Sequence, residues 1–319
     1  MAKVWTMGEF LCEIMRPEVG LPLDQPGSFL GPYPSGAPAI FIDTVARLGQ
    51  SAGIIGGVGK DDFGKCMLER LEKDGVDCSL VNQYDDGSTG VAFVTYFSDG
   101  SRRFIFHFSD TPATRPTAPS IDKLGDDVQY FHIMGCSLMA KKEFGQEIIK
   151  VMRNLAKTGV MISFDPNIRP ELMNDDSTIQ MVQEVLMNCN VLLPGKDELL
   201  MICGVECVDD AVNTCFDNPA LETIVLKNGA KGCTVYTRSD YFSLNAYPIE
   251  AVDSTGAGDC FDGAFLCGLL EGKSLRAAAE IASAAAAINT MAFGPMEGNI
   301  TKTSVEEMIT YHRLSSTAL

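Results

Sequence analysis

The sequence has few of the features that mark membrane and nucleic-acid-binding proteins. No apolar run in its 319 residues approaches the roughly 20 residues that a membrane-spanning helix requires. Positive charge is scarce, because 25 Lys and Arg stand against 42 Asp and Glu. The resulting net charge of −17 repels nucleic acid and anionic lipid. We therefore expect neither a nucleic-acid partner nor a membrane partner.

The cysteines show none of the spacings typical of zinc or redox sites. None of the eleven cysteines forms a Cys-x-x-Cys pair, and the nearest two, Cys203 and Cys207, have no histidine close by to complete a zinc site. The first residues, MAKVWTMGEF, contain no extended apolar stretch typical of an export signal. Many unpatterned thiols without such a signal indicate a reducing compartment, so we expect a cytoplasmic protein.

Short apolar segments alternate with longer segments of helical period. The segments KVWTM, SAGIIGGVG, VQYFHIMG, VMISFDPN, NVLLPG and TIVLKNG are rich in β-branched residues and bounded by Gly, Pro or Asn, which is typical of buried strands. Between them, segments such as APAIFIDTVARLG and FGKCMLERLEKDG carry apolar residues at helical spacing and end in Gly. The alternation predicts an α/β fold with a mainly parallel sheet and helices on both faces.

Two segments depart from this alternation. GVAFVTYFSDGSRRFIFHF reads as two strands around Ser98-Asp99-Gly100, and the stretch from Leu11 to Gly36 is rich in Pro and Gly. Together they predict a small second sheet formed by residues 10–33 and 87–111. The main α/β domain then consists of residues 1–9, 34–86 and 112–319.

A flexible stretch followed by an acid precedes a helical pattern near the C-terminal end. Gly256, Ala257 and Gly258 lead directly to Asp259, after which Phe261 begins an apolar helical face. The first turn of a helix offers unpaired N–H groups and a favourable dipole, so this turn suits a phosphate. Asp259 is then either a helix cap, worth about 0.5–2 kcal/mol, or a general base for a group that attacks the phosphate. These residues alone leave both open.

The motif DSTGAGDCFDGAF resembles the C-terminal signature of the ribokinase-like (PfkB) family of sugar kinases, and the resemblance extends along nearly the whole chain. GGVGKDDFG, YPSGAPAIFIDTVARLG and FDPNIR are similar to further segments of that family. The resemblance implies a ribokinase-like three-layer α/β/α domain. It also implies that the small sheet is a lid, which in the family often forms the interface of a homodimer.

The resemblance assigns roles around the phosphoryl group. It implies that Asp259 deprotonates the sugar hydroxyl, and that Gly256, Ala257 and Gly258 hold the phosphoryl group in flight. Asp253 and Thr255 match positions at which the family often binds a monovalent cation such as K⁺. Turn and helix-cap chemistry is an alternative role for these two residues.

The resemblance also implies ATP and Mg²⁺ as the nucleotide and metal. Lys227 would approach the phosphates, while Gly229 and Gly232 would let the nucleotide pass close to the backbone. Ser283 matches a position beside the adenine, although a small packing residue is an alternative there. Glu198 matches the acid that supports Mg²⁺ through water, but Gly195 replaces the Asn of that motif.

On the sugar side, the resemblance assigns contacts to Glu13, Gly36, Asn167 and Arg169. The chain departs from the family pattern at two positions, where Ser35 replaces a Gly and Ile40 replaces a sugar-binding Asn. Glu13 stands where the family usually has Asp, and either carboxylate can accept two hydroxyl groups.

We therefore expect an ATP-dependent sugar kinase that phosphorylates a primary hydroxyl. Kinases of 2-keto-3-deoxygluconate share the FDPNIR stretch but often carry an Arg in the lid strand, where this chain has the run Phe106-His107-Phe108. This difference favours a neutral ketohexose such as fructose or tagatose, or ribose, with the keto-deoxy acid as an alternative. Arg102 or Arg103 remains a candidate to reach the site. A catalytically silent sugar- or nucleotide-binding regulator is an alternative of another class, whereas the first strand lacks the Gly-x-Gly-x-x-Gly of a dinucleotide-dependent oxidoreductase.

Overall fold

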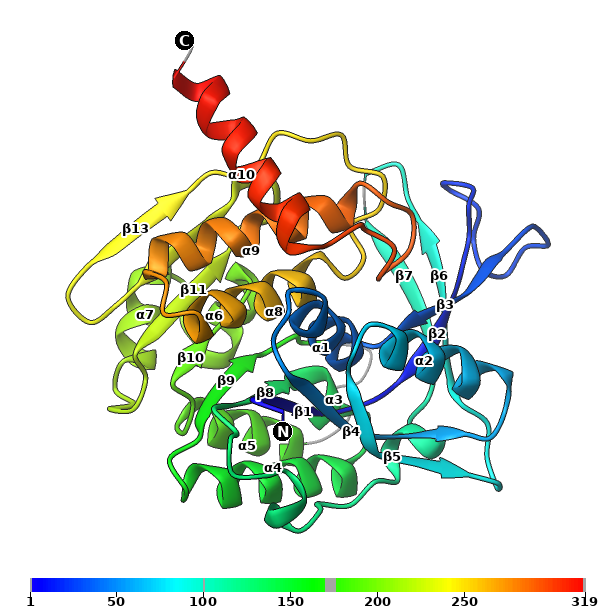
Figure 1. Cartoon of the computed structure of the whole chain (residues 1–319). Coiled ribbons are helices and arrows are strands. Elements are labelled where there is room, and N and C mark those ends of the chain that lie inside the picture. The colour runs from blue at the N-terminus through cyan, green and yellow to red at the C-terminus, as the bar shows by residue number, and fades with distance from the viewer. Residues whose placement is uncertain (1, 100, 170–175, 318–319) are drawn as a thin grey trace.

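The computed structural model describes residues 2–99, 101–169 and 176–317 of the chain. In this part of the chain, nine strands form one large sheet in the order β13-β12-β11-β10-β9-β8-β1-β4-β5 (Figure 1). All neighbours from β11 through β5 pair in parallel, whereas β12 and β13 extend the edge in antiparallel fashion. The strands are β1 (Val4–Met7), β4 (Ala52–Gly59), β5 (Asp77–Tyr84), β8 (Tyr130–Met134), β9 (Met161–Asp165), β10 (Val191–Leu192), β11 (Thr223–Lys227), β12 (Cys233–Tyr236) and β13 (Tyr241–Leu244). The predicted mainly parallel sheet is confirmed.

Helices cover both faces of this sheet and create two apolar cores. One core contains buried side chains from α3 (Gly135–Ala140), α4 (Lys142–Ala156), α5 (Asp176–Leu186), α6 (Lys196–Cys203) and α7 (Val208–Cys215). The other contains side chains from α1 (Ala37–Arg47), α2 (Asp62–Lys73), α8 (Ala257–Leu270), α9 (Leu275–Thr290) and α10 (Lys302–Thr317). The fold is thus the three-layer α/β/α arrangement that the sequence predicted.

The four strands β2 (Leu11–Met15), β3 (Leu30–Ser35), β6 (Gly90–Tyr96) and β7 (Arg102–His107) form a second sheet in the order β3-β2-β6-β7. It projects from one side of the main domain (Figure 1). β6 and β7 pair antiparallel from Val91↔His107 to Tyr96↔Arg102, which confirms the predicted hairpin. Side chains alternate between the two faces of a strand, so Arg102 lies on the same face as Phe104 and Phe106, while Arg103 lies on the opposite face.

The strand order of the large sheet indicates where a ligand can bind. β1 pairs in parallel with β4 on one side and with β8 on the other. After β1 the chain first adds β4 and β5 on one side of it and then adds β8 and the later strands on the other side. In open α/β sheets, ligands bind at such a switch point, outside the carboxyl ends of the strands. In the described residues, no helix is both long enough and apolar enough to cross a membrane.

Candidate active site

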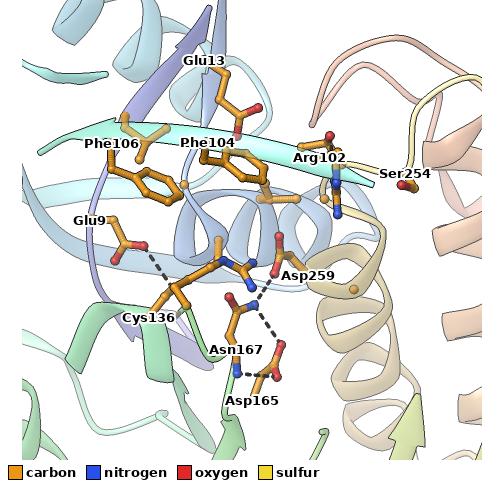
Figure 2. Close-up of a pocket in the computed structure, with 18 of the residues that line it drawn as sticks. Glu9, Glu13, Arg102, Phe104, Phe106, Cys136, Asp165, Asn167, Ser254 and Asp259 are labelled. Atoms are coloured by element: carbon orange, nitrogen blue, oxygen red, sulfur yellow. Dashed lines mark hydrogen bonds between the residues drawn. The ribbon is translucent and has the colours of Figure 1, made fainter. Parts of the chain in front are cut away.

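A cavity of about 220 Å³ lies between the carboxyl edge of the large sheet and the small sheet. Its polar side chains follow the ends of several strands or line the facing side of β7. Figure 2 shows how Asp165, Asn167 and Asp259 approach one another below the phenylalanines of β7. The residues that line the cavity include Glu9, Glu13, Gly36, Ile40, Arg102, Phe104, Phe106, Phe108, Cys136, Asp165, Asn167, Arg169, Gly195, Glu198, Lys227, Ser254, Thr255, Gly256, Gly258 and Asp259.

Asp259 lies in the first turn of α8 and faces this cavity. Its side chain is buried, and Asn167 Nδ2 donates a hydrogen bond of 3.1 Å to Asp259 Oδ1. Burial raises the pKa of Asp259 to about 7, with a further rise from the nearby Asp165 carboxylate; Arg169, Lys227 and Arg102 act in the opposite direction. A general base is most effective when its pKa is close to the working pH. The environment of Asp259 therefore suits proton abstraction at neutral pH.

The turn before Asp259 is shaped for close approach to the backbone. Gly256 is the N-cap of α8 and has a φ of 76°, a left-handed conformation that favours glycine. A Cβ atom on Gly256 would lie 2.4 Å from the carbonyl oxygen of Pro295, so a larger residue does not fit. Gly258 lines the cavity beside the Lys227 ammonium. The turn and the start of α8 together present N–H groups and a positive dipole end to an anion.

Lys227, the last residue of β11, stands between two carboxylates. Its Nζ lies 2.8 Å from Asp165 Oδ2 and 3.0 Å from Asp262 Oδ2. Burial acts to lower the pKa of Lys227, but the two carboxylates raise it above its usual value, so the ammonium stays charged. Lys227 therefore reaches the site as part of a buried ion cluster, not as a solvated lysine.

Glu198 lines the same cavity from the first turn of α6. Its Oε1 accepts a 2.9 Å hydrogen bond from the Ile168 amide, and its Oε2 accepts one of 2.7 Å from the Gly195 amide. The described residues contain no cluster of three metal-ligating side chains. Mg²⁺ usually keeps several waters and binds through one or two carboxylates plus substrate phosphates. A single carboxylate such as Glu198 beside a phosphate turn fits that mode, although both of its oxygens already accept backbone hydrogen bonds.

The part of the cavity around Glu13, for which the sequence predicts a sugar contact, is lined by acids. Glu13 Oε1 accepts a 2.6 Å hydrogen bond from the Ser35 hydroxyl, while Glu13 Oε2 is buried without a hydrogen-bond partner among the described residues. Burial raises the pKa of Glu13 to about 7. Ser35, which replaces a family glycine, thus orients Glu13. Glu9 is also buried, and it accepts hydrogen bonds from Ser137 and from the Cys136 thiol.

Three further features shape this cavity. Gly36 begins α1 with a φ of 104°, and a Cβ atom there would lie 2.6 Å from the Glu9 carbonyl oxygen. Across the cavity, Phe104 and Phe106 of β7 and Phe108, which follows the strand, form an apolar wall. Ile40, in place of the family asparagine, adds a further apolar contact to the lining. The cavity therefore offers carboxylates on one side and hydrocarbon on the other.

Two arginines enter the cavity from different elements. Arg169 follows β9 and donates a 3.3 Å hydrogen bond to the Ile168 carbonyl oxygen. Arg102 comes from β7 and donates a 2.9 Å hydrogen bond to Thr255 Oγ1. Of the two lid arginines considered from the sequence, the structure therefore places Arg102 at the cavity and Arg103 on the opposite face of β7.

Asp253 and Thr255 form a hydrogen-bonded turn beside the cavity. Asp253 Oδ1 accepts hydrogen bonds from the Thr255 amide and hydroxyl, and Asp253 Oδ2 accepts from the Gly294 amide and the Tyr96 hydroxyl. Asn289 Nδ2 donates to the Thr255 carbonyl oxygen. A monovalent cation at this turn would share these oxygens with the donors that already contact them.

A second cavity, of about 510 Å³, lies on the other side of the α8 turn. It is bounded by Lys227, Gly229 and Gly232, by the segment from Ala246 to Ile249, and by Ser283 on α9. Gly232 has a φ of 92°, and a Cβ atom there would lie 1.9 Å from the Leu244 carbonyl oxygen. The two cavities share Lys227, Ser254 and Gly258, so a ligand in each would meet at the start of α8.

Three buried acids of the site were not singled out from the sequence. Asp165 ends β9 and Asp262 lies one turn beyond Asp259 on α8, and both pair with Lys227. Asp165 belongs to the FDPNIR stretch, so its position at a strand end was a usable signal. Asp262 follows Asp259 by three residues, a helical spacing that places both on one side of α8. Glu9 lies two residues after β1, and apart from this position nothing in the sequence indicated that it belongs to the site.

Comparison with known proteins agrees with this geometry. The family model described as pfkB family carbohydrate kinase matches residues 3–302. Probable fructokinase-4 from Arabidopsis thaliana is 30% identical over 316 residues, covering 95% of each chain, and fructokinase-1 from Zea mays is 29% identical, covering 96% of this chain and 97% of that one. An E. coli structure provisionally named a ribokinase II, in complex with ATP and Mg²⁺, is 37% identical with a TM-score of 0.92, covering 98% of this chain and all of that one. The chain belongs to the pfkB family of carbohydrate kinases.

Proposed function

We propose that this carbohydrate kinase transfers the γ-phosphate of ATP to a primary hydroxyl of a neutral ketohexose, with fructose and tagatose as the preferred candidates and ribose as a smaller alternative. The observation that carries the choice of a neutral sugar is the lining of the first cavity. It combines the unpaired carboxylate oxygen of Glu13 with the buried acid Glu9 and the apolar wall of β7.

The site residues divide between two substrates. In this proposal the sugar occupies the cavity between Glu13 and Asp259, and ATP occupies the cavity beyond α8, with its adenine near Ser283 and its phosphates near Lys227. The γ-phosphorus then lies at the α8 turn, where the two cavities meet. The E. coli relative in complex with ATP and Mg²⁺, which is 37% identical, supports ATP as the nucleotide.

The transfer itself requires one proton acceptor and one anion site. Asp259 takes the proton of the sugar hydroxyl, whose oxygen forms a bond to the γ-phosphorus as the bond to the β-phosphate oxygen breaks and ADP leaves. The N–H groups of the Gly256–Asp259 turn stabilise the charge on the phosphoryl group. Asn167 holds Asp259 through its 3.1 Å hydrogen bond. Mg²⁺, bound mainly through phosphates with Glu198 nearby, would neutralise phosphate charge.

The acids that favour a polyol disfavour a sugar acid. A carboxylate substrate would face Glu9 and Glu13 and would need a bidentate cation in compensation. Arg102 is engaged with Thr255, and Arg169 lies on the FDPNIR side of the site. Hydroxyl groups can instead donate to Glu13 Oε2, which satisfies a buried acceptor that otherwise lacks a partner among the residues described.

The test is a substrate panel with purified protein. ADP release would be followed with ATP and Mg²⁺ and with fructose, tagatose, ribose or 2-keto-3-deoxygluconate, and kcat/KM compared under one condition. We expect a ketohexose to lead by more than tenfold over the keto-deoxy acid. A tenfold preference for that acid would contradict the neutral-sugar proposal. No turnover with any sugar, despite ATP binding, would instead favour the silent regulator.

Further expectations concern the assembly and the solution conditions. We propose that the small sheet is a lid and that its outer face forms a homodimer interface. The exposed apolar residues Leu30 and Ile105 on that sheet, with Phe29 just before β3, support this role. Light scattering of the protein and of the Ile105→Asp variant tests whether the protein is a dimer and whether the variant is a monomer.

The free state of all eleven cysteines supports a cytoplasmic location. Replacing KCl with choline chloride in the assay tests activation by K⁺.

A further inference from the structure

The small sheet contacts the turn that leads into α8 through two polar side chains. Tyr96 and Arg102 are register partners at one end of the β6–β7 ladder. The Tyr96 hydroxyl donates a 3.1 Å hydrogen bond to Asp253 Oδ2 and lies 3.3 Å from Thr255 Oγ1, and Arg102 Nη1 donates to Thr255 Oγ1 at 2.9 Å. Side chains at the paired ends of β6 and β7 therefore contact the same turn, residues 253–255.

The turn is buried and depends on these donors. Asp253 is 3% exposed and accepts from the amides of Thr255 and Gly294, from the Thr255 hydroxyl and from Tyr96. A buried carboxylate is stabilised by the donors that it receives, and loss of one leaves acceptor capacity unsatisfied. The main domain supplies three of these hydrogen bonds, whereas Tyr96 belongs to the small sheet.

The turn connects directly to the phosphoryl site. Thr255 precedes Gly256, the N-cap of α8, and Asp259 follows within one helical turn. Asn289 fixes the Thr255 carbonyl oxygen from α9, while Arg102 fixes its hydroxyl from the small sheet. Displacement of Thr255 would move the N–H groups that receive the phosphoryl charge, and small misplacements of this kind are costly for catalysis.

A cation and a cluster of aromatic rings also lie where the small sheet contacts the main domain. Arg102 brings a cation beside the cavity acids Glu13 and Asp259, as Figure 2 shows. Phe293 precedes Gly294, whose amide donates to Asp253 Oδ2. The Phe293 ring packs edge-on against Tyr33 of β3, with ring centroids 6.0 Å apart, and at a tilt against Tyr96, with centroids 6.1 Å apart. The small sheet thus meets the main domain through an aromatic cluster beside two charged or polar hydrogen bonds.

From this arrangement we propose that Tyr96 and Arg102 are positioning residues, which tie the seating of the small sheet over the sugar to the geometry of the phosphoryl-binding turn. The proposal rests on the proposed function, because it takes the first cavity as the sugar site. Its consequence is coupling: a bound sugar that holds the small sheet in place also orders residues 253–259. In the absence of sugar, ATP then meets a less ordered turn, and transfer of its phosphate to water is slow.

The test uses conservative variants of the two residues and a matched control. Tyr96→Phe keeps the ring that packs on Phe293 and removes the hydroxyl, while Arg102→Gln removes the guanidinium. Arg103→Gln changes the neighbouring arginine on the exposed face of the same strand. Thr255→Val removes the shared hydroxyl with little change of shape. Each variant is assayed for sugar phosphate and ADP, and examined by hydrogen exchange with and without sugar.

We expect kcat to fall about tenfold in Tyr96→Phe and about 10- to 100-fold in Arg102→Gln, with the KM for ATP within about twofold of the parent. Sugar-induced protection of residues 253–259 against hydrogen exchange should be lost in Arg102→Gln and kept in Arg103→Gln. Because Arg102 acts through Thr255, the double variant Arg102→Gln/Thr255→Val should be no slower than the slower single variant.

The outcomes separate the proposal from the proposed function. If the parent phosphorylates a sugar but both variants retain the sugar-induced protection and kcat of the parent, the positioning role is overturned while the kinase assignment holds. Fully additive losses in the double variant would overturn the path through Thr255. If the parent phosphorylates no sugar on the panel, the proposed function fails before the variants are compared.

Discussion

Replacement of Asp259 by asparagine tests the central assignment, because it changes charge with little change of shape. The buried carboxylate accepts a hydrogen bond from Asn167 through Oδ1. An asparagine retains an acceptor oxygen for this bond but cannot take a proton from a hydroxyl. We expect Asp259→Asn to fold, to bind ATP and to lose about 10²–10⁴-fold in kcat, as is typical when a general base is removed.

The same substitution should stabilise the fold above neutral pH. Burial raises the pKa of Asp259 from 3.8 to about 7, so the unfolded chain releases its proton at a lower pH than the folded chain. The free energy of unfolding of the parent therefore falls as pH rises from about 4 to about 7, by at most about 4 kcal/mol from this group. The neutral amide of the Asp259→Asn variant lacks this cost. After allowance for the nearby cations, we expect a gain of about 1–3 kcal/mol at pH 8 that shrinks towards pH 4.

The assay combines kinetics with urea unfolding of both proteins at pH 5, 7 and 8. A turnover within threefold of the parent, about 0.65 kcal/mol in the barrier, would refute the role of Asp259 as base. A variant that is less stable than the parent at pH 8 would refute the claim that the carboxylate is held at an energetic cost. The Arg103→Gln variant, which replaces a charged side chain by an amide on the face of β7 opposite the cavity, serves as the control with near-parental turnover.

Each remaining prediction concerns one ionisable side chain of the same site. The kcat/KM for sugar should fall below an apparent pKa near 7 as Asp259 takes up a proton, and a flat profile from pH 5 to 8 would contradict it. Lys227→Met leaves Asp165 and Asp262 without their cation and should cost about 3–5 kcal/mol in urea unfolding, so an unchanged midpoint would count against the ion cluster. Glu13→Gln should raise the KM for sugar about tenfold and leave the KM for ATP unchanged. A raised KM for ATP with an unchanged KM for sugar would instead indicate that ATP, and not the sugar, occupies the cavity beside Glu13.

Local sequence patterns predicted the elements but not how distant elements meet. The predicted strands and the β6–β7 hairpin are confirmed because apolar period and turn chemistry are properties of short segments. The cluster of Lys227, Asp165 and Asp262 was not predicted, because it joins β11, β9 and α8 across nearly 100 residues. The choice between Arg102 and Arg103 likewise required the register of the ladder, in which Arg102 is the partner of Tyr96.

The arrangement of charge explains how a chain with a net charge of −17 can bind ATP. A polyanion gains nothing from the overall field of such a protein, so the attraction must be local. Lys227 is already neutralised by two carboxylates and cannot supply it alone. The start of α8 adds to the attraction, because its N–H groups and the positive end of its dipole face an anion in the cavity. The acids Glu9 and Glu13 line the same cavity, across from the phenylalanines of β7, where in the proposed function they would repel a misplaced phosphate and accept hydrogen bonds from sugar hydroxyl groups. In the proposed function, this arrangement would hold the sugar and the phosphates of ATP apart and select against a sugar that carries a negative charge.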